Sequence, residues 1–93
     1  MEDREEMKKF KSYPLLMATL PHTLSAYEEN IYIYAARYTY SRNTGAAFQV
    51  VNSLLNNWNK FSDHFKDKVY KESKKEAVYN KEDWQRVWDK YES

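Results

Sequence analysis

The spacing of apolar residues between positions 24 and 42 predicts one long helix in the middle of the chain. The stretch from Ile31 to Asn43, IYIYAARYTYSRN, begins with a strand-like alternation, but AAR at positions 35–37 breaks it. At the helical period, apolar residues fall on two opposite faces, with Leu24, Tyr27, Ile31, Tyr34, Ala35 and Tyr38 on one and Tyr32, Ile33, Ala36 and Tyr40 on the other. A helix of this kind is usually buried between neighbours, so we predict a central core helix over about 25–42. Ser25 and Glu28 are spaced as a capping box at its start.

Shorter helices are predicted on either side of this one. Residues 2–11 change from acidic to basic, which suits a helix dipole, and Pro14 and Pro21 bracket a short buried connector. Residues 46–60 form a broad apolar arc, made of Ala47, Val50, Val51, Leu54, Leu55 and Trp58. A helix over about 63–77, capped by Ser62 or Asp63, has an apolar inner side made of Phe65, Val69, Tyr70 and Ala77.

The last helix has the clearest start signal. Asn80 is predicted as its N-cap and Asp83 as its third residue, with Tyr79 and Trp84 spaced as a hydrophobic staple. One apolar stripe then follows, made of Trp84, Val87, Trp88 and Tyr91. The 93 residues include one glycine and two prolines, whereas sandwiches and barrels need many glycines at turns and bulges. We therefore expect an all-α fold, a compact bundle of four to five short helices in a single domain over residues 1–93.

Charge and composition exclude several classes of protein. The net charge is +1, so the chain is neither an acidic DNA mimic nor a globally basic nucleic-acid binder. The sequence has no cysteine, and therefore no disulfide and no thiolate metal site. No apolar run approaches the ~20 residues of a transmembrane helix, and the acidic N-terminus lacks the apolar core of a signal peptide. These features predict a soluble, cytoplasmic protein.

No combination of residues indicates catalysis. The two histidines, His22 and His64, are far apart in the sequence, and Asp63 and Asp67 near His64 are best explained as a solvated helix start. Gly45 stands alone, so the chain has no glycine-rich phosphate loop. We expect a protein without enzymatic activity, metal or cofactor.

Arginine and tyrosine gather at the end of the central helix, in the stretch RYTYSRN at positions 37–43. Tyrosine and arginine are enriched in protein interface hot spots, and the same chemistry serves base stacking. The residues assigned to partner binding here are Arg37, Tyr40, Arg42 and Asn43. The competing explanation is structural, with Tyr38 in the core and Arg42 bonded to carbonyls at the helix end. If a partner binds, a protein is favoured over nucleic acid because the overall charge is nearly balanced.

The helix over 46–60 has a face without charge. It carries Gln49, Asn52, Ser53, Asn56 and Asn59. An exposed face that is depleted of charge is typical of an interface core, so Asn52 and Asn56 join the partner-binding residues. The alternative is that the N-terminal segment or a second copy of the chain covers this face.

The outer side of the helix over 63–77 carries four lysines: Lys68, Lys71, Lys74 and Lys75. A row of lysines can bind phosphates. However, three acidic residues are interleaved at helix-pair spacing, namely Asp67, Glu72 and Glu76. A solvated helix face is therefore favoured, and phosphate binding is the second interpretation.

Two blocks in the middle of the chain, YAARYTYSRNTGAA and VVNSLLNNWNKFSD, resemble short, largely uncharacterised helical proteins encoded by phages and prophages of Gram-positive bacteria. The resemblance lies within about 34–63 and is carried by Tyr34, Ala35, Arg37, Tyr38, Arg42, Thr44, Val51, Leu55, Asn57, Trp58, Ser62 and Asp63. The chain departs from the pattern at Ser41, where glycine is expected, and in the NTGAA connector. The resemblance brings no catalytic residue with it, but it implies a phage accessory protein acting in the cytoplasm of a bacterial host.

These observations lead to one functional hypothesis and two alternatives. We expect a small non-enzymatic phage-type protein that binds and inhibits or remodels a host protein, with an anti-CRISPR-like inhibitor of host defence as its concrete form. The first alternative is a nucleic-acid-binding accessory or regulatory protein that uses Arg37, Arg42 and the lysine face. The second is a structural phage component that self-associates through exposed aromatic residues such as Trp84 or Tyr91.

Overall fold

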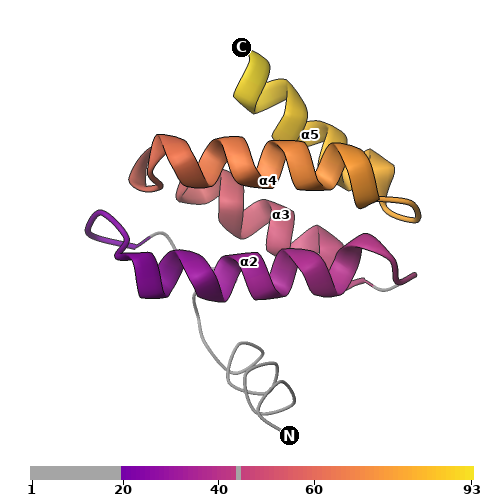
Figure 1. The fold of residues 1–93 in the computed structure, drawn as a ribbon, viewed down its shortest axis with the longest axis horizontal. Helices are drawn as coiled ribbons and strands as arrows, with labels where there is room; N and C mark the ends of the chain where they lie inside the picture. The colour runs from indigo at the N-terminus through magenta and orange to yellow at the C-terminus, as the bar shows by residue number, and fades with distance from the viewer. Residues whose placement is uncertain (1–19, 44) are drawn as a thin grey trace, which may run out of the picture.

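Four α-helices and one short 3₁₀ helix make up the part of the chain that the computed structural model describes, residues 20–43 and 45–93 (Figure 1). The elements are α2 (Ala26–Tyr40), α3 (Ala46–Asn56), η2 (Trp58–Lys60), α4 (Asp63–Glu76) and α5 (Lys81–Glu92). These two ranges contain no strand, and the all-α bundle expected from the sequence is confirmed. The predicted helix over 2–11 and most of the connector over 14–21 lie outside the described residues.

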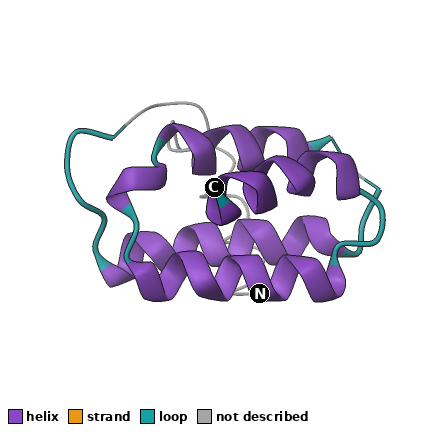
Figure 2. Ribbon diagram, turned by 90° about the horizontal axis from the view of Figure 1, so that it is seen from above, coloured by secondary structure: helices purple, strands orange, loops and turns teal. Residues whose placement is uncertain are grey.

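The four helices form two layers around one core. α2 and α4 lie side by side in one layer, and α3 and α5 form the other (Figures 1 and 2). Between the layers, α2 packs against α3 and α4 packs against α5. Hydrogen bonds tie α2 to α4 near both ends. The Ser62 N–H donates to Glu29 Oε2 at 2.6 Å, and the Val78 N–H donates to the Tyr40 carbonyl at 3.0 Å. The two helices of this layer therefore run parallel to each other.

α2 is the central helix, but only part of its predicted apolar surface is buried. The face with Tyr32 and Tyr40 is fully buried, and both rings meet other aromatics edge-on in the core. On the opposite face Ile31 is buried, whereas Tyr27 and Tyr34 are 56% and 40% exposed. The expectation that neighbours cover both faces is therefore wrong for these two tyrosines.

Polar residues predicted as caps begin two of the helices as expected. Ser25 and Glu28 form the capping box of α2, and the Ser62 hydroxyl accepts the Phe65 N–H at the start of α4. Asn80 occupies the N-cap position of α5, but its side chain makes no cap hydrogen bond there. Tyr79 is 61% exposed and lies outside the core cluster, so the predicted staple with Trp84 is not formed.

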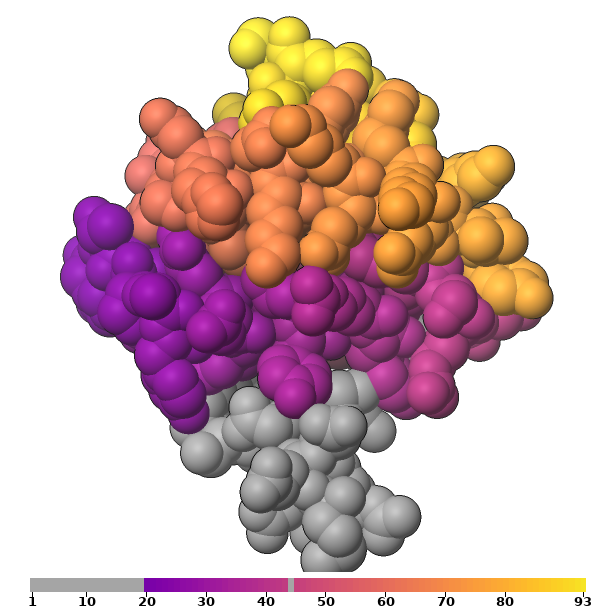
Figure 3. All heavy atoms as spheres, viewed as in Figure 1, coloured from indigo at the N-terminus to yellow at the C-terminus, as the bar shows by residue number. Residues whose placement is uncertain are grey.

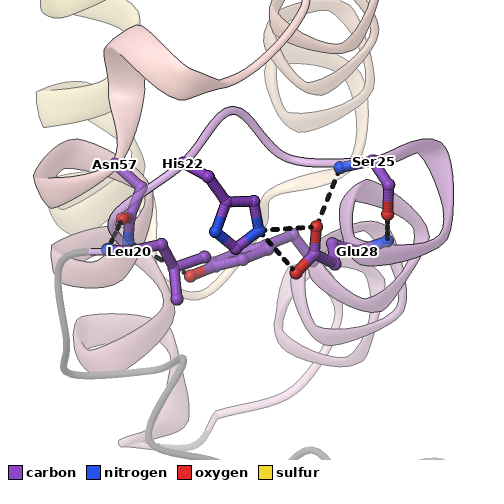
Figure 4. Close-up of polar contacts among 6 residues, drawn as sticks. Leu20, His22, Ser25, Glu28 and Asn57 are labelled. Atoms are coloured by element: carbon purple, nitrogen blue, oxygen red, sulfur yellow. Dashed lines mark hydrogen bonds and ion pairs between the residues drawn. The ribbon is translucent and has the colours of Figure 1, made fainter.

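α3 ends earlier than the predicted 46–60, because the buried Asn57 side chain bonds to the backbone. Its Nδ2 donates to the Ser53 carbonyl at 2.9 Å. Its Oδ1 accepts the Leu20 N–H at 2.6 Å, which fixes the segment that leads into α2 (Figure 4). The chain then continues through η2 instead of a further turn of α-helix. Across residues 20–43 and 45–93, none of the helices has both the length and the apolar character needed to cross a membrane.

Candidate functional site

A groove of about 250 Å³ lies where α2 meets α4, on the face of the molecule that Figure 3 shows. Its lining residues come from both helices and are Tyr27, Asn30, Ile31, Ile33, Tyr34, Arg37 and Lys68. Pockets that bind cofactors or drug-sized ligands usually measure about 300–1,000 Å³. The size of this groove therefore suits one or two side chains of a partner better than a cofactor.

The helical repeat of α2 explains which side chains line the groove. Positions 27, 30, 34 and 37 are three or four residues apart, so they share one face of the helix. Ile31 and Ile33 are nearly fully buried and flank this face on its two sides, as the aliphatic part of the lining. The two half-exposed tyrosines and Arg37 therefore lie between two buried isoleucines of the same helix.

Arg37 is held in place by α4. Its Nη2 donates to Glu72 Oε2 at 2.9 Å and its Nε donates to Glu72 Oε1 at 3.3 Å. These hydrogen bonds are the main reason that the pKa of Arg37 is raised. The Arg37 side chain is still 56% exposed. A guanidinium has five N–H donors, so three of them remain available to a partner.

The predicted row of lysines on α4 does not form one uniform cationic face. Lys68 lines the groove, and within the described part of the chain no carboxylate oxygen lies within 4.0 Å of its ammonium group. Lys71 pairs with Asp67 at 3.2 Å, and Lys74 lies 4.8 Å from the centre of the Trp88 ring, towards α5. Lys75 is exposed and does not line the groove.

The predicted partner-binding cluster at the end of α2 is also divided. Tyr40 is 1% exposed, so its assignment to a partner surface is wrong, because its ring packs against Trp84 with a centroid distance of 5.1 Å. Arg42 and Asn43 are exposed as expected. The Arg42 guanidinium lies 4.7 Å from the centre of the Tyr38 ring. Arg37 is therefore the one member of this cluster that the groove includes.

The charge-free face of α3 is partly internal. Ser53 is fully buried, and its Oγ lies 2.6 Å from the hydroxyl of Tyr32 in the core. Asn52 is half-buried and Asn56 is exposed, and neither residue lines the groove. Ser53 is therefore covered by α2, which neither interpretation of this face expected, and the role of Asn52 and Asn56 in partner binding remains a prediction.

The groups that could carry out catalysis or bind metal are dispersed. His22 lies on the surface before α2, with its Nε2 3.2 Å from Glu28 Oε2 (Figure 4), while His64 is exposed on α4. The Ser25 N–H bonded to Glu28 is the main reason that the pKa of this carboxyl is lowered. Among residues 20–43 and 45–93, no group of three His, Asp or Glu side chains is placed to hold a metal ion.

Sequence reasoning missed the two tyrosines of the groove, since it placed them on an apolar helix face expected to be buried and did not determine which tyrosines are exposed. A signal was available, because the polar residues Asn30 and Arg37 share their face of the helix. Such a face is partly solvated rather than buried. Comparison of the chain with protein-family models, with curated proteins and with solved structures gave no match.

Proposed function

We propose that this chain is a small, non-enzymatic binding protein that holds a protein partner in the groove between α2 and α4. One observation carries the proposal: Tyr27 and Tyr34 are half-exposed beside Arg37, on one face of one helix. Tyrosine and arginine are enriched among the residues that contribute most to protein binding. Tyrosine rings also offer a large contact area at a small cost in conformational entropy.

The resemblance to phage and prophage proteins suggests a specific form of this activity. In that form the protein acts in a bacterial host and occludes a functional surface of a host protein, as an inhibitor of host defence does. An interface of ordinary size covers about 800 Å² on each partner. The chain has 5916 Å² of accessible surface, so a partner of this kind needs only a modest part of it.

Nucleic-acid binding is the second candidate, because Lys68 joins Arg37 and two aromatic rings in the same groove. The wider charge distribution argues against it. α2 and α4 together carry six lysine and arginine side chains and six carboxylates, so the layer that forms the groove has no net charge. Binding to a phosphate backbone depends mainly on an excess of positive charge. The balance favours a protein partner.

The proposal is tested by affinity capture from bacterial lysate with a tagged chain, with and without nuclease, followed by quantitative mass spectrometry. The double variant Tyr27→Ala and Tyr34→Ala is compared with a control, Val78→Ala and Tyr79→Ala, which removes two large, exposed side chains outside the groove. We expect a protein that survives nuclease treatment and that only the groove variant loses.

Purified partner then allows a direct measurement of affinity. Arg37→Ala should weaken binding by about tenfold or more, as truncation of a hot-spot residue does. Equal capture by the groove variant and the control variant would contradict the proposal. Capture that disappears with nuclease would instead support nucleic-acid binding.

A further inference from the structure

The charges that line the groove are all of one sign. Arg37 and Lys68 are its two ionised residues, and no carboxylate is among the seven lining residues. We infer that the groove binds a segment of the partner protein that presents one aspartate or glutamate carboxylate between Lys68 and Arg37. This inference rests on the proposed function and adds the chemistry of the partner to it.

Both cations can donate hydrogen bonds to such a carboxylate. Glu72 accepts two N–H groups of Arg37, which leaves three donors on a guanidinium whose position is already fixed. Lys68 has three donors and no carboxylate within 4.0 Å among the described residues. Charge-assisted hydrogen bonds are roughly twice as strong as neutral ones, so an acidic side chain is the best match for these donors.

The rest of the lining specifies what accompanies the carboxylate. Ile31 and Ile33 supply the aliphatic part of the lining, and Tyr27 and Tyr34 lie on either side of Asn30. A volume of about 250 Å³ leaves room for an apolar or aromatic side chain beside the acidic one. The expected motif is therefore an aspartate or glutamate next to a large apolar residue.

A single carboxylate fits this surface better than the backbone of a nucleic acid. A nucleic acid places a phosphate at every nucleotide, so neighbouring phosphates would meet the carboxylates of α4. Glu72 lies directly beside the groove, through its ion pair with Arg37, and Glu76 follows one turn later. Because Arg37 and Lys68 provide positive charge only within the groove, while the layer of α2 and α4 is neutral, a ligand with one anionic group is favoured over one with many.

The test uses the full chain as bait for a randomised peptide library displayed on phage. We expect the enriched peptides to contain aspartate or glutamate beside an aromatic or aliphatic residue. A synthetic copy of an enriched peptide is then compared with its glutamine or asparagine counterpart by fluorescence anisotropy. The counterpart should bind about tenfold more weakly or worse, the effect of losing a hydrogen bond to a charged group.

Charge reversal on the protein provides the matched pair of variants. Lys68→Glu should weaken the binding of the acidic peptide by about tenfold or more. Lys75→Glu, the same change outside the groove, should alter this affinity by less than about twofold. Lys68→Gln removes the charge without adding repulsion next to Glu72, and it keeps the test valid if Lys68→Glu does not fold. Circular dichroism establishes that each variant is folded.

Three results would overturn the inference. These are equal binding of the amide counterpart, equal effects of Lys68→Glu and Lys75→Glu, and displacement of the peptide by a thymidine oligonucleotide at similar concentration. Failure here is distinct from failure of the proposed function. If capture from lysate depends on Tyr27 and Tyr34 but none of the charge variants changes it, the protein-binding proposal stands and the inference of an acidic group on the partner is wrong.

Discussion

Two buried tyrosines of α2 allow a matched test of how hydrogen bonding in the core affects stability. Tyr32 and Tyr40 are 0% and 1% exposed, so both hydroxyls have lost contact with water. The Tyr32 hydroxyl lies 2.6 Å from Ser53 Oγ and accepts Asn57 Nδ2 at 3.3 Å. The Tyr40 hydroxyl has no hydrogen-bond partner among the described residues. Burial is the main reason that the pKa of both phenols is raised.

The same substitution should therefore have opposite effects at the two positions. Tyr32→Phe breaks two hydrogen bonds and leaves the Ser53 hydroxyl without this partner, which costs about 1–3 kcal/mol. Tyr40→Phe removes a buried hydroxyl that finds no hydrogen-bond partner in residues 20–43 and 45–93, and burial of such a group costs about 1–3 kcal/mol. The phenylalanine ring keeps the edge-on contact with Trp84. Tyr40→Phe is thus expected to stabilise the protein, and the two variants should differ by at least ~2 kcal/mol.

Urea unfolding, followed by circular dichroism and by tryptophan fluorescence, measures this difference. With a slope of about 1–3 kcal/mol per molar urea, the two midpoints should be separated by roughly 1 M. Tyr79→Phe, at an exposed position outside the groove, is the control and should stay within about 0.5 kcal/mol of the parent chain. Equal destabilisation by Tyr32→Phe and Tyr40→Phe would refute the reasoning, because it would mean that the Tyr40 hydroxyl is hydrogen-bonded in solution.

Three other changes should alter stability in predictable directions. Ser25→Ala removes the capping box of α2 and should lower the free energy of unfolding, measured by urea unfolding, by about 1 kcal/mol. Gly45→Ala should raise it by about 0.4–1 kcal/mol, because Gly45 has right-handed helical angles and open space at its Cβ. Hydrogen bonds to carboxylates on the neighbouring helix raise the pKa of Tyr70 and Tyr91. The stabilisation of the folded state by these bonds is therefore complete below about pH 10 and is lost as the pH rises through the pKa values of the folded protein. Above about pH 10 the free energy of unfolding should therefore fall less steeply with pH in the double variant Tyr70→Phe and Tyr91→Phe than in the parent chain.

The helices were predictable because their signals are local. The apolar period of α2, its capping box and the cap of α4 are each formed by residues that are close together in the sequence. The roles of two asparagines were not predictable. Asn57 bonds to Leu20, 37 positions away, and the Asn80 side chain donates to the carbonyls of Thr39 and Arg42, 41 and 38 positions away. Asparagine is a mediocre helix former, and both positions use it for contacts that only the tertiary fold provides.

The groove depends on the register between α2 and α4, which no local pattern reveals. Arg37 and Lys68 belong to separate features of the sequence, and the parallel packing of the two helices brings them to one groove. That packing is fixed at one end by the bond from Ser62 to Glu29 and by a backbone bond at the other. Moving α4 along α2 by one turn, about 5.4 Å, would bring Glu72 or His64 to the place of Lys68. The charge of the groove, and with it the chemistry of the partner, therefore depends on the register in which α2 and α4 pack.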